Sequence, residues 1–134
     1  MTILAVADTH AIIWYLYDDS RLSTLAQTMM DDAATNGDQI ALSSISLAEM
    51  VYLIDKGRID PQTSDRVFAA LDQADAVLVE VPFDRQVARA MRSVDRAAVP
   101  DFPDRMIAAT AVRLAVPLIS RDGKIRTSTV TTIW

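Results

Sequence analysis

The segment Ile-Leu-Ala-Val-Ala-Asp, residues 3–8, is the part of the sequence that most clearly predicts a fold with a parallel sheet. Its first five residues form an unbroken apolar run, which is typical of a strand that is buried on both faces of a parallel sheet. The run ends at Asp8, and the next residue, Thr9, can cap a helix that extends to Tyr17. The segment therefore predicts a strand, an acidic residue at its carboxyl end, and a helix that follows at once.

Predicted strands and helices continue to alternate along the rest of the chain. Further strands are expected near 39–43, at 76–81, at 116–120 and, as a short last strand, at 130–134. A helix is expected from a cap at Ser23 to about residue 35, with a stop at Asn36-Gly37, and another from Asp60-Pro61 to about residue 73. Further helices are expected at 46–56, 84–94 and 104–115. Residues 95–103 are expected to form a loop, and Asp122-Gly123 a turn. This order predicts a single three-layer α/β/α domain over residues 1–134, with a mostly parallel central sheet of four to five strands.

Four acidic residues share one kind of position, where an apolar run gives way to a polar turn or to the start of a helical pattern. They are Asp8, Glu49, Asp104 and Asp122. Because the carboxyl ends of parallel strands share one edge of a sheet, and ligands bind in the crevice there, we expect the four side chains to line one pocket.

Clustered carboxylates without histidine or cysteine form an all-oxygen site, which suits Mg²⁺ or Mn²⁺ and disfavours zinc. Mg²⁺ typically takes one or two protein carboxylates and keeps several waters, so it leaves positions for a phosphate oxygen and an attacking water. Such a cation polarises the phosphoryl group and lowers the pKa of bound water. The pattern therefore indicates metal-dependent hydrolysis of phosphodiesters.

Each of the four acids also has a purely structural explanation. Asp8 and Asp104 can complement the dipole at a helix N-terminus, and Asp122 precedes a glycine, as tight turns prefer. Glu49 stands three residues after Ser46, and this spacing matches a capping box in which the glutamate folds back onto the cap residue. Taken singly, the acids leave both interpretations open.

Composition limits the other functions. The net charge is −5, from 13 basic and 18 acidic residues, which is the wrong sign for binding nucleic acid by bulk electrostatics. There is no cysteine, and no segment resembles a cleavable leader or a membrane span, so a cytoplasmic protein without a membrane partner is expected. His10 is interpreted as a packed or capping side chain. The row Arg85, Arg89, Arg92 and Arg96 is interpreted as a solvated helix face rather than an RNA track.

The acids lie within four ordered motifs. These are Asp8-Thr9-His10 with Trp14 four residues on; Ser43-Ser44-Ile45-Ser46-Leu47-Ala48-Glu49 followed by Lys56-Gly57-Arg58-Ile59; Asp101-Phe102-Pro103-Asp104-Arg105 with the helix after it; and Leu118-Ile119-Ser120-Arg121-Asp122-Gly123-Lys124-Ile125. In this order, over nearly the whole chain, they resemble the PIN-domain nucleases, and most closely the VapC-type toxins of bacterial and archaeal toxin–antitoxin pairs.

This resemblance implies a Mg²⁺-dependent endoribonuclease in which Asp8 and Asp104 hold the metal while Glu49 and Asp122 complete the quartet. It implies hydroxyl assistance from Thr9 and Ser120. It also implies a homodimer, an RNA substrate, and an antitoxin whose C-terminal segment blocks the site, with operator DNA reached only through that antitoxin. Asp101 is acidic too and competes with Asp104, which is favoured because it directly precedes the Arg and the apolar helix.

Two other classes of function compete with this one. A non-catalytic PIN-like module could use the acidic pocket only to hold a basic partner segment, which suits the negative net charge. A phosphotransfer domain with strand-end aspartates fits less well, because Asp8-Thr9-His10 has no second aspartate two residues on. Metal binding at the quartet separates the nuclease from the binding module.

Overall fold

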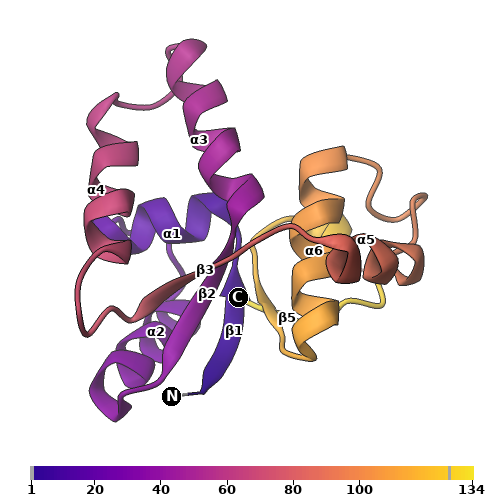
Figure 1. The fold of residues 1–134 in the computed structure, drawn as a ribbon, viewed down its shortest axis with the longest axis horizontal. Helices are drawn as coiled ribbons and strands as arrows, with labels where there is room; N and C mark the ends of the chain where they lie inside the picture. The colour runs from indigo at the N-terminus through magenta and orange to yellow at the C-terminus, as the bar shows by residue number, and fades with distance from the viewer. Residues whose placement is uncertain (1, 127) are drawn as a thin grey trace.

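The computed structural model, which describes residues 2–126 and 128–134, is built on a five-stranded sheet (Figure 1). Its strands are β1 (Ile3–Ala7), β2 (Gln39–Ser43), β3 (Leu78–Val81), β4 (Leu118–Ile119) and β5 (Thr132–Ile133). The strand order is β3-β2-β1-β4-β5, and every neighbouring pair is parallel. The predicted α/β class and parallel sheet are therefore confirmed.

This strand order has a topological switch point. The chain moves outward from β1 to β2 and β3, then returns to β4 on the other side of β1. In open α/β sheets the crevice at the carboxyl ends of the two diverging strands is the usual ligand site. Here those ends are followed by Asp8 after β1 and by residues 120–122 after β4.

Helices cover both faces of the sheet, which gives three layers (Figure 1). They are α1 (Thr9–Leu16), α2 (Thr24–Asn36), α3 (Ser44–Asp55), α4 (Gln62–Leu71), α5 (Arg85–Ala90), the 3₁₀ turn η1 (Met91–Ser93), α6 (Phe102–Leu114) and α7 (Gly123–Arg126). Alternation along β1 divides the core: Ala5 and Ala7 pack with residues of α1 to α4, whereas Val6 packs with residues of α5 and α6. Among the described residues, no helix is both long and apolar enough to cross a membrane.

Local signals predicted some element boundaries correctly. The bounds of β1 and β2 are as expected, and the Ser23 hydroxyl accepts a hydrogen bond from the Ala26 N–H at 3.1 Å, so it caps α2. Gly37 ends that helix at φ 74°, a left-handed conformation that favours glycine. At α4 the prediction is one residue early: Asp60 accepts from the Gln62 N–H at 2.7 Å, but Pro61 is the N-cap and the helix begins at Gln62.

Three other predicted helix starts are wrong. The N-cap of α1 is Asp8 rather than Thr9, and α3 begins at Ser44 with Ser43 as its N-cap, not at Ser46. Helix α6 begins two residues earlier than predicted, with Asp101 as its N-cap and a proline in its first turn. Proline is tolerated there because its missing N–H would have no intrahelical partner.

Other differences are smaller. The predicted helix 84–94 is α5 followed by η1, because the chain tightens after Ala90. The predicted turn at Asp122-Gly123 continues into the short helix α7, and β3 and β4 are shorter than expected. Arg105 on α6 donates to the carbonyl oxygens of Met91 and Val94 at 2.9 and 3.1 Å. This contact fastens η1 to α6.

Candidate active site

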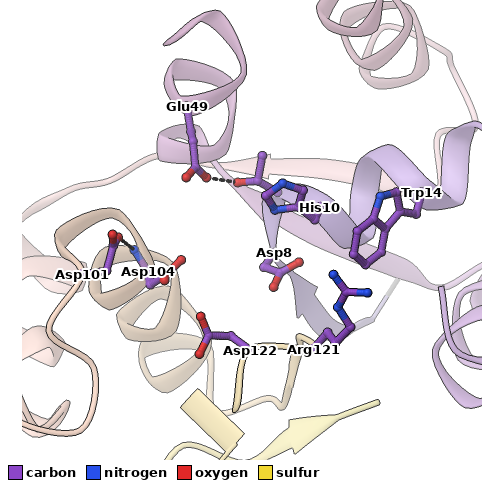
Figure 2. Close-up of a pocket in the computed structure, with 9 residues that line it drawn as sticks. Asp8, His10, Trp14, Glu49, Asp101, Asp104, Arg121 and Asp122 are labelled. Carbon is purple, nitrogen blue, oxygen red and sulfur yellow. Dashed lines mark hydrogen bonds between the residues drawn. The ribbon is translucent and has the colours of Figure 1, made fainter. Parts of the chain in front are cut away.

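The four predicted carboxylates line one pocket of about 280 Å³ at the carboxyl edge of the sheet (Figure 2). Its lining residues are Asp8, Thr9, His10, Trp14, Glu49, Asp101, Asp104, Arg121 and Asp122. They come from the end of β1, from α1, α3 and the start of α6, and from the loop after β4. The prediction that these acids share a pocket is therefore confirmed, and five other residues join them.

Asp8 lies at the centre of this edge and has two structural partners. Its carboxylate accepts a hydrogen bond from the Ala11 N–H at 2.9 Å, and so it caps α1 while facing the pocket. Burial raises the pKa of Asp8 above its ordinary value, and hydrogen bonds from the Ser120 hydroxyl and the Ala11 N–H oppose that rise. The helix-cap explanation therefore holds and leaves room for a further partner, because the two carboxylate oxygens can serve different partners.

Glu49 does not form the capping box that its spacing indicated. It lies in the second turn of α3, and its Oε1 accepts a hydrogen bond from the Thr9 hydroxyl instead (Figure 2). The Thr9 oxygen lies 3.0 Å from the hydroxyl oxygen of Ser46, which is fully buried. A hydroxyl carries one proton, so Ser46 donates to Thr9 and Thr9 donates to Glu49. This chain of hydrogen bonds orients the glutamate.

Asp101 and Asp104 occupy different positions at the start of α6. Asp101 is exposed, and its carboxylate accepts from the Asp104 N–H at 3.2 Å, as an N-cap does. Asp104 is in the first turn of the helix and is partly buried beside the pocket. The capping role thus belongs to Asp101, and the Asp104 carboxylate has no hydrogen-bond donor within residues 2–126 and 128–134.

The electrostatic environment of Asp104 is unfavourable to its charged form. Desolvation by burial is the largest cause that raises the pKa of Asp104 to about 7. Further increases come from the negative charges of Asp101, Asp122, Glu49 and Asp8, in that order. A bound cation would remove this penalty, because it would replace like-charge repulsion by attraction.

Asp122 faces Asp104 in Figure 2, and hydrogen bonds to neighbouring residues in the chain fix its position. Its N–H donates to the Ser120 hydroxyl at 3.1 Å, and its carboxylate accepts from the Lys124 and Ile125 N–H groups at 2.8 and 3.2 Å. Asp122 therefore caps α7 and lines the pocket, as Asp8 does for α1.

Three pocket residues were not predicted as members of the site. His10 is exposed at the rim, so its interpretation as a packed or capping side chain is wrong, and its ring lies 5.6 Å from that of Trp14. Trp14 is 5% exposed and belongs to the core, but it also forms a wall of the pocket. Arg121 stacks its guanidinium over Trp14 at 4.5 Å from the ring centroid. Its place directly before Asp122 was the one available signal.

The oxygen donors that line the pocket suit a hard divalent cation. In the part of the chain that the structure describes, no group of three His, Cys, Asp or Glu side chains is arranged to hold a metal ion. Mg²⁺ needs only one or two protein carboxylates, with water as its other ligands. The donors are carboxylate oxygens without any sulfur, and burial and like charge at Asp104 would both be relieved by a nearby cation. In their chemistry, these residues fit a hard divalent cation.

The predicted arginine row does not remain on one helix. Arg85 and Arg89 lie on α5, Arg92 lies on η1, and Arg96 follows in the loop before α6. All four are exposed, which agrees with a solvated face, and none of them lines the acidic pocket.

Comparisons with known proteins agree with this architecture. Residues 5–127 match the PIN domain family, so the chain belongs to the PIN-domain family. No curated protein matches it significantly.

Several solved structures share its fold. VapBC2 from Rickettsia felis, bound to a DNA fragment from its promoter, has a TM-score of 0.71 at 17% identity, over 98% of both chains. A toxin–antitoxin complex from Klebsiella pneumoniae has a TM-score of 0.67 at 21% identity, over 97% of this chain and 96% of the other. FitAcB from Neisseria gonorrhoeae has a TM-score of 0.63 at 20% identity, over 98% and 97%. These likenesses concern the fold.

Proposed function

We propose that this PIN-domain protein is the toxin of a type II toxin–antitoxin pair and acts as a Mg²⁺-dependent endoribonuclease, with Mn²⁺ as a possible substitute. The observation that carries the proposal is the convergence of Asp8, Glu49, Asp104 and Asp122 on one pocket at the switch point of the sheet. The similarity in fold to toxin–antitoxin complexes supports the choice of system.

In the proposed reaction a water attacks a phosphodiester of RNA and leaves a 3′-hydroxyl and a 5′-phosphate. Mg²⁺ would supply positive charge for the phosphoryl oxygens and acidify the water. Asp8 and Asp104 would hold the cation. Glu49, whose orientation is fixed by the Thr9 hydroxyl, and Asp122 would complete the acidic quartet around the cation and its bound water.

The experiment is Mg²⁺-dependent cleavage of single-stranded RNA by the wild type, Asp8→Asn and Asp104→Asn. We expect each variant to lose at least about a hundredfold in rate, which is a loss typical of removing charge at a metal-assisted site. Asp32→Asn is the matched control, because Asp32 is exposed on α2 and carries the same charge outside the pocket. Full activity in both pocket variants would sink the assignment.

A second function is a non-catalytic module whose pocket holds a basic segment of a partner. It is favoured by the net charge of −5 and by the five carboxylates that line the pocket. A guanidinium inserted among the carboxylates would offset the same repulsion that a cation would. Calorimetric titration with Mg²⁺ and Mn²⁺ decides between the two functions, since a pure binding module need not bind metal at the quartet.

The proposed protein partners are a cognate antitoxin and a second copy of the chain, in the cytoplasm, with operator DNA reached only through the antitoxin. Exposed apolar side chains on α3 and α4 support a protein partner: Val51, Tyr52 and Phe68 are 48%, 53% and 42% exposed. Light scattering of the isolated chain tests the homodimer, and copurification with the product of the neighbouring gene tests the antitoxin.

A further inference from the structure

Arg121 is the one lysine or arginine among the described residues that lines the acidic pocket. The other charged groups around it are five carboxylates, those of Asp8, Glu49, Asp101, Asp104 and Asp122. A flexible cation in such surroundings would normally fold onto a carboxylate and form an ion pair. In the described residues Arg121 forms none, and its N–H groups donate to no protein acceptor.

Trp14 holds the guanidinium away from the acids. The Arg121 guanidinium carbon lies 4.5 Å from the centroid of the Trp14 ring, within the range of a cation–π contact. The ring itself is fixed: Trp134 packs edge-on at 5.9 Å, and Arg21 lies over it at 5.1 Å with its own charge paired to Asp19 at 2.7 Å. Trp14 is therefore a rigid surface on which a planar guanidinium rests with its donors unused.

The backbone of the β4 loop aims two neighbouring side chains in different directions. The Asp122 N–H and carboxylate are both engaged locally, by Ser120 and by the start of α7, which fixes the loop. As a result Asp122 points toward Asp104, whereas Arg121 points toward Trp14 and lies on the other side of Asp8 (Figure 2). The pocket thus has an acidic floor and one fixed cation at its rim.

We propose that Arg121, held against Trp14, binds a phosphate of the RNA strand next to the phosphate that lies over the carboxylates. The inference rests on the proposed function. Five carboxylates repel a polyanion, so a strand that enters this pocket needs positive charge at a fixed place. A guanidinium presents paired N–H donors that match two phosphate oxygens, and its stacking on an indole leaves that edge free.

The test compares Arg121→Ala with Arg66→Ala. Arg66 is a matched control because its guanidinium also stacks on an aromatic ring, 4.4 Å from the Tyr17 centroid, and is exposed outside the pocket. For Arg121→Ala we expect the KM for single-stranded RNA to rise at least about tenfold, as for loss of a charged hydrogen-bonded pair. We expect kcat to change less than about threefold, because the contact is made before and during the reaction alike. Arg66→Ala should leave both unchanged.

A second readout does not need cleavage. In EDTA, the affinity for a fluorescein-labelled single-stranded RNA is measured by anisotropy against salt concentration. Loss of one phosphate contact should lower the slope of log K against log [salt] by about 0.7 in Arg121→Ala. Arg121→Lys, which keeps the charge but not the planar fork, should restore the slope and recover the KM only in part. Trp14→Phe, with its smaller ring, should raise the KM with the charge still present.

The outcomes separate this inference from the proposed function. If the wild type cleaves RNA while Arg121→Ala and Arg66→Ala behave alike, the role of Arg121 is refuted and the nuclease stands. If the RNA affinity depends on Arg121 but the wild type does not cleave RNA, the nuclease is refuted and the phosphate contact stands. If Arg121→Ala instead lowers the melting temperature in EDTA and leaves the KM and the salt slope unchanged, Arg121 is a structural counter-ion and the inference is wrong.

Discussion

The two walls of the acidic pocket are built in opposite ways. On the wall formed by β1, α1 and α3, hydrogen bonds orient both acids: Asp8 accepts from the Ala11 N–H, and Glu49 accepts from Thr9. On the wall formed by α6, the Asp104 carboxylate has no donor among the described residues, and burial with nearby charge raises its pKa to about 7. One wall is therefore preorganised, whereas the acid on the other wall would be stabilised by a nearby positive charge.

The difference matters because a pocket that was fully satisfied by its own donors would have little affinity for a cation. Hydrogen bonds stabilise the charged form of a carboxylate and weaken its need for metal, whereas desolvation and like charge do the opposite. Keeping Asp104 unsatisfied costs stability in the free protein. In the proposed nuclease a bound cation would offset this cost, as is common at functional sites.

The largest expected effect comes from removing the charge of Asp104. In EDTA at pH 8, Asp104→Asn should raise the free energy of unfolding by about 1–2 kcal/mol, a value reduced for solvent screening at a partly exposed side chain. The same variant should lose RNA cleavage. Urea unfolding and a cleavage assay on one preparation measure both, with Asp32→Asn as the control that should stay within about 0.5 kcal/mol of the wild type. A destabilised Asp104→Asn would contradict the picture of an unsatisfied wall.

The pH dependence of stability tests the same wall in the wild type. The pKa of Asp104 is raised from 3.8 to about 7, so between these values the folded state binds more protons than the unfolded state. Stability should therefore fall as pH rises through this window, by about 1–2 kcal/mol after screening, and level off above pH 7. Raised for the same reason, the pKa of Asp8 acts in the same direction.

Millimolar Mg²⁺ should remove this fall, because a cation that binds only the folded protein stabilises it and favours the ionised carboxylates. Thermal melts at pH 5.5 and pH 8, each with Mg²⁺ and with EDTA, give the comparison. The rise in melting temperature on adding Mg²⁺ should be larger at pH 8 than at pH 5.5. An equal rise at both pH values would contradict the raised pKa of Asp104.

On the preorganised wall the expected effect is smaller. Thr9→Val keeps the side-chain shape but leaves the buried Ser46 hydroxyl without its acceptor and Glu49 without its donor. We expect a loss of about 1–2 kcal/mol in stability, the usual cost of an unsatisfied buried hydroxyl, and about a tenfold loss in cleavage rate. Thr9→Ser should recover both, since it restores the hydroxyl. Recovery of stability without recovery of cleavage would show that orientation of Glu49 is not what Thr9 supplies.

Local patterns predicted the strand of the preorganised wall better than its helix starts. The apolar run of β1 and its terminal Asp8 are adjacent in sequence, so the strand and the acid at its end could be predicted together, whereas Thr9 was wrongly expected to cap α1. The start of α6 was displaced because two prolines indicated a loop, although proline is compatible with a first helical turn. The capping box at Ser46 failed because α3 begins directly after β2, so Glu49 lies too far into the helix.

The individual side-chain contacts between distant segments could not be predicted. Arg121 and Trp14 meet only because β4 pairs with β1 and brings the β4 loop beside α1. Nothing in the residues around either side chain specifies the other. The pairing of Thr9 with Ser46 and Glu49 has the same origin, since it depends on β1 lying next to β2. The four acids could be selected from the sequence, but the groups that orient or oppose them could not.

The smallest expected effect separates Asp101 from Asp104. Asp101→Asn keeps an oxygen that can accept from the Asp104 N–H, and asparagine is as good an N-cap as aspartate, so stability at pH 4, where Asp104 is still protonated, should change by less than about 0.5 kcal/mol. Among the nearby negative charges, that of Asp101 raises the pKa of Asp104 most. Its removal should therefore shift the midpoint of the pH-dependent loss of stability to lower pH. Cleavage should stay within about threefold of the wild type, because a capping residue holds no substrate. Urea unfolding across pH 4–8 and the RNA assay measure these quantities, and a loss of cleavage as large as that of Asp104→Asn would place Asp101 among the metal ligands instead.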